Sequence, residues 1–184
     1  GFVNAYGQKD DLEEIKKDIE QLGFSASIYG RTRFHKIPTR YGLIEFTAEN
    51  YHLRISSSSL ATLFYVLEYP KGEKTAAAYE VPIWIMHSPL WIKRLFLSGL
   101  FGAELSSPRT HTKTGFDVPT LSMNKITSLL ANGRKFMIQI MQLLEEFGIS
   151  IDTILERDDF KNKHGATSRL KLQISSKEDN LILL

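Results

Sequence analysis

The amino-acid sequence predicts an α+β fold made of a duplicated unit, in which helices cover one face of antiparallel strands. Three observations lead to this prediction: a helix–glycine–strand pattern occurs twice, a strand–Ser-Ser–helix pattern occurs twice in the same order, and the predicted strands alternate polar with apolar residues. The 184 residues suffice for one domain or two small ones, and 42% hydrophobic with 24% charged residues is an ordinary globular balance.

Each repeated pattern keeps its order along the chain. The first is found in DDLEEIKKDIEQLGFSASI and again in RKFMIQIMQLLEEFGISIDTI, at a constant offset of 125 residues, and each helix stops at Gly23 or Gly148. The second pairs residues 52–64 with 171–183 at an offset of 119 residues. Chance similarity between two amphipathic helices is the alternative, but two patterns that recur in the same order favour duplication. The apolar positions at helical spacing are Leu12, Ile15, Ile19 and Leu22, then Met137, Ile140, Leu144 and Phe147.

The chain divides into two predicted halves. Residues 1–68 form the first half and residues 88–184 the second. Residues 69–87 are the predicted linker, because they contain YPKGEKTAAAYEVP, which is rich in Pro, Gly, Lys and Ala. Ser88 and Pro89 offer an N-cap and a first-turn proline, which predicts that a helix begins there.

The predicted strands separate an apolar face from a basic one. In SIYGRTRFHK (27–36), YHLRIS (51–56) and RLKLQI (169–174), alternate positions hold Arg, Lys, His, Tyr or Gln. Such faces are often merely solvated, but basic residues here outnumber acidic ones, and a β-ribbon of this kind fits the major groove of double-stranded DNA. The residues predicted to bind DNA are Tyr29, Arg31, Arg33, His35, Arg54, Arg109, Arg169, Lys171 and Gln173.

Composition excludes several classes of protein. The chain has no cysteine, so it has no disulfide, thiolate metal site or cysteine nucleophile, and a reducing, cytoplasmic setting fits. No signal peptide is visible at the N-terminus. The apolar run 95–103 is shorter than the roughly 20 residues that span a bilayer, which favours a buried core helix. The net charge of +2 is too small to indicate a partner by itself.

The helix predicted from Pro89 onward contains small residues at helical spacing. Ser98 and Gly102 lie four residues apart, as do Gly99 and Ala103, and such stripes let a second helix approach closely. Helix-interior glycines cost about 1 kcal/mol each, which a close helix–helix contact would justify. At the C-terminus of this helix the macrodipole disfavours an anion, so a carboxylate there fits best beside a cation such as Mg²⁺.

LSGLFGAEL (97–105) resembles the motif of the LAGLIDADG homing endonucleases, and the helices and strands around it resemble that family's αββαββα unit. The resemblance implies two antiparallel sheets, related by a pseudo-two-fold axis, that form a saddle on double-stranded DNA. It also implies site-specific hydrolysis of phosphodiester bonds with Mg²⁺ or another divalent cation. Glu104 matches the acidic metal ligand of the second motif, and Lys171 matches a charge-stabilising lysine, with a phosphate contact as its alternative role.

The first motif of that family is not matched. GFVNAYG (1–7) has Tyr6 where the acid should stand, and residues 2–6 are better explained as a strand before the helix of 10–22. We therefore expect a fragment that lacks the first motif helix, which a second chain or an upstream segment would supply, and we expect it to bind DNA without cutting it alone. The resemblance is strongest to intein-borne members, although no splicing block is present. The alternatives are a catalytically incomplete DNA-binding module, an RNA maturase of the same fold, or an unrelated basic α+β protein.

Overall fold

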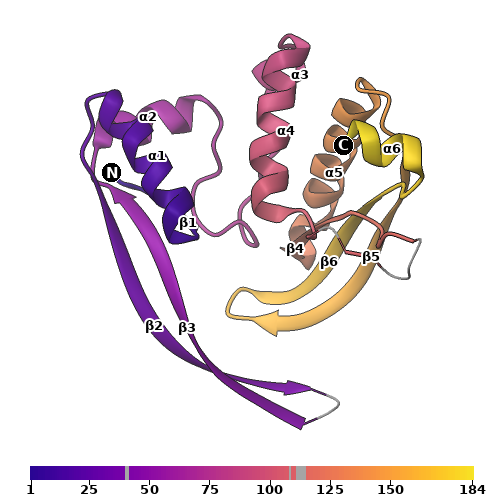
Figure 1. The fold of residues 1–184 in the computed structure, drawn as a ribbon, viewed down its shortest axis with the longest axis horizontal. Helices are drawn as coiled ribbons and strands as arrows, with labels where there is room; N and C mark the ends of the chain where they lie inside the picture. The colour runs from indigo at the N-terminus through magenta and orange to yellow at the C-terminus, as the bar shows by residue number, and fades with distance from the viewer. Residues whose placement is uncertain (40–41, 108, 111–114) are drawn as a thin grey trace. The chain divides into compact units, whose positions relative to one another are not determined.

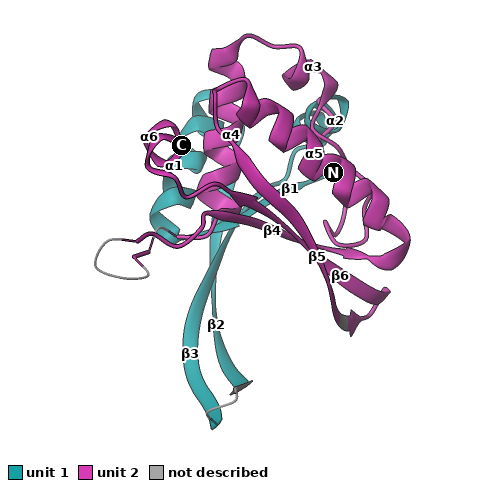
Figure 2. Cartoon of the chain, turned by 90° about the vertical axis from the view of Figure 1, so that its right-hand side faces the viewer, with its two compact units in different colours: residues 1–66 teal, residues 67–184 magenta. Residues whose placement is uncertain are grey.

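The computed structural model describes residues 1–39, 42–107, 109–110 and 115–184, and it divides the chain into two compact units, Gly1–Val66 and Leu67–Leu184 (Figure 2). Each unit contains a three-stranded antiparallel sheet and buries its own cluster of apolar side chains. The chain is therefore α+β with two antiparallel sheets. The duplicated αββαββα units and the pseudo-two-fold saddle stay predictions.

Unit 1 packs two helices on one face of a sheet whose strand order is β1-β3-β2. Leu12, Ile19 and Leu60 of the helices are buried against Leu53 and Ile55 of the central strand. The β2–β3 hairpin is long and extends well beyond the helices (Figure 1). The elements are β1 (Val3–Gly7), α1 (Lys9–Gln21), β2 (Ala26–Thr39), β3 (Gly42–Ile55) and α2 (Ser58–Val66).

The strand predicted at residues 2–6 and the helix predicted at 10–22 are both confirmed, each within one residue. The core face of that helix is narrower than expected, since Ile15 is 40% and Leu22 is 68% exposed. Leu12 and Ile19 are the residues of α1 that are buried in the core of unit 1.

Unit 2 also packs helices on one face of a three-stranded sheet, and its apolar cluster is larger. Its strand order is β4-β6-β5, and α5 covers the apolar face of the sheet through Met137, Ile140 and Leu144. Leu170, Leu172 and Ile174 of β6 are fully buried, as their alternation predicts. The elements are α3 (Ile83–Met86), α4 (Leu90–Glu104), β4 (Thr120–Ile126), a 3₁₀ turn (Thr127–Leu129), α5 (Leu130–Glu145), β5 (Ile151–Asn162), β6 (Gly165–Ile174) and α6 (Glu178–Leu183).

The helices α1 of unit 1 and α5 of unit 2 end in the same way. Gly23 after α1 has φ 85° and Gly148 after α5 has φ 77°, a left-handed conformation that glycine adopts without strain. In both units the next residue donates its backbone N–H to a helix carbonyl, Phe24 to Ile19 and Ile149 to Leu144, each at 3.1 Å. The helix–glycine–strand pattern thus produces one local geometry twice.

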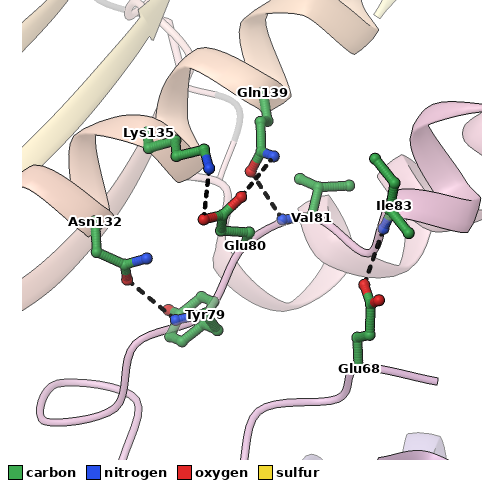
Figure 3. A network of polar contacts seen from close by, with 8 residues as sticks. All are labelled: Glu68, Tyr79, Glu80, Val81, Ile83, Asn132, Lys135 and Gln139. Carbon is green, nitrogen blue, oxygen red and sulfur yellow. Dashed lines mark hydrogen bonds and ion pairs between the residues drawn. The ribbon is translucent and has the colours of Figure 1, made fainter. Parts of the chain in front are cut away.

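Residues 67–82 belong to unit 2, and residues 79–81 of this segment lie beside α5 (Figure 3). The amide oxygen of Asn132 accepts the backbone N–H of Tyr79, and that of Gln139 accepts the N–H of Val81. Glu80 forms an ion pair with Lys135 of α5 at 2.7 Å. The segment expected to be a linker is therefore held by side chains of α5. Its sequence lacks strand or helix periodicity, which is why composition alone suggested a linker.

Lys125 of β4 is fully buried and fixes the same segment. Its ammonium donates to the backbone oxygens of Lys74 at 2.8 Å and Ala77 at 2.5 Å, and it lies 3.7 Å from the centroid of the Tyr79 ring. Burial disfavours the charged amine and lowers the pKa of Lys125 to about 8. Burial also raises the pKa of the Tyr79 hydroxyl to about 12, with a smaller contribution from Glu104.

The predicted helix start at Ser88 and Pro89 is shifted by one residue. Pro89 occupies the N-cap position of α4, while the Ser88 hydroxyl donates to the backbone oxygen of Ile85 at the end of α3. On α4, Lys93 is 6% exposed and bonds both carboxylate oxygens of Glu146 at 2.7 Å. Among the described residues, no helix is both long enough and apolar enough to cross a membrane.

Candidate nucleic-acid interface

The open face of the unit 1 sheet gathers five of the residues predicted to bind DNA. The unbroken β2–β3 register pairs Tyr29 with His52 and His35 with Phe46, so Tyr29, Arg31, Arg33 and His35 share one face. Arg54 of β3 lies on that face too, opposite Ser27 of β2. The helices pack on the other face, which leaves this one open within the unit.

Charge is separated between the two faces of this hairpin. Across residues 3–7, 26–37 and 44–55, the open face holds three arginines and two histidines and no Asp or Glu. The opposite face holds the acidic Glu45 and Glu49, and Lys36 pairs there with Glu45 at 2.6 Å. A surface with cations and no carboxylates attracts a polyanion.

Two residues on this face were not among the predicted site residues. Tyr6 of β1 pairs with His52 of β3, and their rings stack with centroids 5.7 Å apart. The sequence predicted a strand at residues 2–6, but it gave no register for that strand against β3. In the sequence, Tyr6 stands where the motif would require an acid. In the structure, it lies on the open face of the sheet beside His52.

The polar face of the unit 2 sheet is less basic. Arg169 of β6 bonds Asp159 at 2.9 Å and the amide oxygen of Asn124 at 3.2 Å, so its guanidinium already has an internal carboxylate partner. Lys171 and Gln173 follow on the same face, opposite Ser122 and Thr120 of β4. The alternation predicted these residues' common face but not the pairing with Asp159, which lies beside a bulge of β5.

A pocket of about 580 Å³ in unit 2 brings together four predicted site residues, Glu104, Arg109, Lys171 and Gln173. It opens where the C-terminus of α4 meets the polar ends of β4 and β6. Two carboxylates, Glu104 and Asp117, and two cations, Arg109 and Lys171, line it. The remaining described lining is mostly polar: Leu105, Ser106, Ser107, Val118, Thr120 and Ser122.

Within this pocket, the carboxylate of Glu104 bonds the ammonium of Lys74 at 2.7 Å. The side chains of Glu104 and Lys74 are 37% and 58% exposed, so this ion pair contributes at most about 1 kcal/mol to the free energy of unfolding. In the described part of the chain, no group of three His, Asp or Glu side chains could hold a metal ion. Mg²⁺ at Glu104 therefore stays a prediction.

The small-residue face of α4 has no partner helix in the described structure. Ser98, Gly99, Gly102 and Ala103 are all exposed, and a Cβ placed at Gly99 or Gly102 would meet nothing within 4 Å. The close helix–helix contact expected for this face is therefore absent from the described residues, and these glycines are not explained by packing here.

No family model matches the chain, but related proteins align with most of it. Four archaeal proteins named tRNA-splicing ligase RtcB are 38–41% identical; in the one from Pyrococcus furiosus, 41% identity extends over 78% of this chain and 15% of the relative. Two proteins of Methanocaldococcus jannaschii are each 30% identical: DNA-directed RNA polymerase subunit Rpo1N, over 85% of this chain and 12% of its own length, and replication factor C small subunit, over 83% and 8%.

These relatives correct the identification made from the motif. The chain was expected to be an intein-borne LAGLIDADG homing endonuclease that hydrolyses DNA, associated with protein splicing and intron homing, yet its relatives at 38–41% identity are named tRNA-splicing ligase RtcB. The alternatives of an incomplete module of that fold and of a maturase are not supported either. The resemblance covered one motif and the order of the elements around it, whereas the alignment with the Pyrococcus furiosus ligase is 41% identical over 144 residues. In the described structure, a Cβ placed at Gly99 or Gly102 of the motif would meet nothing within 4 Å. The chain spans about a sixth of the ligases that it matches.

Proposed function

We propose that this chain is a nucleic-acid-binding segment of a larger protein related to tRNA-splicing ligase RtcB, and that the open face of unit 1 holds a DNA duplex. One observation supports this most strongly: that face carries Arg31, Arg33, Arg54 and two histidines without any acidic side chain among its described positions. Clustered cations on a curved two-stranded ribbon suit the phosphate backbone and major groove. The proposed setting is the cytoplasm, in line with a chain free of cysteine.

The relatives support a role separate from ligation. A segment that matches 15–18% of four ligases also matches 12% of an RNA polymerase subunit and 8% of a replication factor. Proteins of these three names carry out different tasks, so a sequence common to them does not owe its pattern to the ligase reaction alone. The names of the ligases mention tRNA, and the name of the polymerase subunit mentions DNA and RNA.

The pocket of unit 2 has a subordinate part in this proposal. Lys171 and Arg109 would contact the phosphate backbone, because their cations line an open pocket beside hydroxyl and amide side chains. Arg169 would contribute less, since Asp159 already neutralises its guanidinium.

The test is a binding titration of the intact chain against labelled DNA duplex, RNA duplex and single-stranded DNA of equal length, followed by fluorescence anisotropy. We expect the DNA duplex to bind with an affinity that falls steeply as salt rises. Preference for the RNA duplex would transfer the proposal to RNA, in agreement with the name tRNA-splicing ligase. Failure of all three to bind at low salt would overturn it.

A further inference from the structure

Three aromatic rings form a continuous row across the open face of unit 1. Tyr6 of β1, His52 of β3 and Tyr29 of β2 occupy one register position of the sheet. The His52 ring stacks on both neighbours, with centroids 5.7 Å from Tyr6 at an interplanar angle of 27° and 5.2 Å from Tyr29 at 21°. Each strand thus contributes one ring to a single stack.

The stack fixes which part of each ring meets solvent. Neighbouring strands lie about 4.8 Å apart, so rings that stack across strands stand upright on the sheet with their faces against one another. Their outer edges point away from the sheet, and Tyr6 is 75% and Tyr29 49% exposed. Each tyrosine hydroxyl both donates and accepts, and an imidazole nitrogen does either according to its tautomer. The row therefore presents the polar edges of three side chains, and stacking restrains the rotamers of these side chains.

Cations surround the row on the same face. Arg54 follows His52 along β3 and lies 4.3 Å from the centroid of the Phe2 ring, while Arg31 follows Tyr29 along β2. Phosphate oxygens only accept hydrogen bonds, and arginines serve them well. Base edges in the major groove present donors and acceptors in a pattern that differs between base pairs, so groups that do both are suited to read them.

We propose that Tyr6, His52 and Tyr29 determine sequence preference by contacting base edges in the major groove, while Arg31, Arg33 and Arg54 contact phosphates. The proposal rests on the proposed binding of a DNA duplex to this face. It assigns a role to two residues, Tyr6 and His52, that were not among the residues predicted to bind DNA.

The experiment selects bound sequences from a pool of DNA duplexes with a randomised centre, using the intact wild-type chain and a variant with Tyr6→Phe, His52→Phe and Tyr29→Phe. Phenylalanine keeps the three-ring stack and removes the polar edges. Tyr51→Phe is the matched control, because Tyr51 lies on the opposite face of the hairpin and its hydroxyl bonds Glu49. Thermal unfolding of each variant verifies that the sheet is intact.

We expect wild type and Tyr51→Phe to enrich the same sequence, and the triple variant to lose that preference by roughly fivefold or more at each base it no longer reads. Its affinity for the unselected pool and its salt dependence should stay close to wild type. If the triple variant enriches the wild-type sequence equally well, or if wild type binds the pool without preferring any sequence, this inference is wrong while the proposed function stands. If wild type does not bind the pool, the proposed function itself fails.

Discussion

At the scale of single residues, alternation and spacing predicted which side chains would gather but not which would pair. The strand pattern placed Arg31, Arg33 and His35 on one face, and the structure has them there. Glu104 was chosen for its position at a helix end, but its partner Lys74 lies 30 residues earlier in a segment without periodicity. Arg169 and Asp159 meet across a bulged strand. Contacts of this kind join separate segments of the chain, and local alternation and spacing do not predict them.

The glycines of the two long helices of unit 2 lead to opposite predictions. A Cβ at Gly133 of α5 would lie 2.8 Å from side-chain atoms of both Leu170 and Lys125, which are fully buried and have no room to move. Gly133→Ala should therefore destabilise the chain by about 1–3 kcal/mol. Gly102→Ala of α4 should stabilise it by up to about 1 kcal/mol, because its Cβ meets nothing and alanine favours a helix.

Urea unfolding of the two alanine variants beside wild type measures both effects. A destabilised Gly102→Ala would mean that this face of α4 does pack on a helix, as the small-residue stripes first suggested. A neutral Gly133→Ala would mean that α5 lies farther from the sheet than the structure has it.

At the scale of elements, the sequence predicted the helices and strands with periodic cores, and it misjudged residues 69–87. Helices that start with a charged turn or end at a glycine, such as α1 and α5, were recognisable to within a few residues. The segment before α3 has no period, so its attachment to α5 through Asn132, Gln139 and the buried Lys125 left no local pattern to recognise.

The buried amine of Lys125 predicts a pH dependence for this attachment. The pKa of Lys125 falls from 10.5 to about 8 on folding, so the cost of holding the charged form in the fold is fully present below pH 8 and is relieved as pH rises above it. The free energy of unfolding should therefore rise between pH 8 and 10, toward a limit on the order of 3 kcal/mol. Measurements should stay below pH 10, because the raised pKa of Tyr79 makes stability fall above it.

The measurement is urea unfolding of wild type and Lys125→Met at several pH values in that window. The difference in stability between the two proteins should change in favour of wild type as pH rises. A difference that stays constant would show that the carbonyl oxygens of Lys74 and Ala77 hold Lys125 as a normal cation.

At the scale of the whole molecule, the repeated patterns and the strand alternation predicted an α+β chain, and the resemblance implied two antiparallel sheets; the described structure contains two such sheets. The function expected from the resemblance was wrong: it was inferred from one motif and from the order of the helices and strands around it, whereas the matches to four ligases named RtcB are 38–41% identical along most of the chain. The proposed binding of nucleic acid to unit 1 is supported by the distribution of charge over the open sheet face. The alternation of residues in β2 and β3 determines this distribution directly.

The salt dependence of duplex binding tests this central claim most directly. We would compare wild type with two double variants. Arg31→Gln/Arg33→Gln removes two cations from the open face. Lys16→Gln/Lys36→Gln removes one cation from α1 and one from the opposite face of the hairpin. The arginine pair should reduce the slope of log affinity against log salt by about two units, one for each lost phosphate contact, and the lysine pair should leave it unchanged. Equal slopes in all three proteins would contradict the assignment of the open face of unit 1 as the nucleic-acid interface.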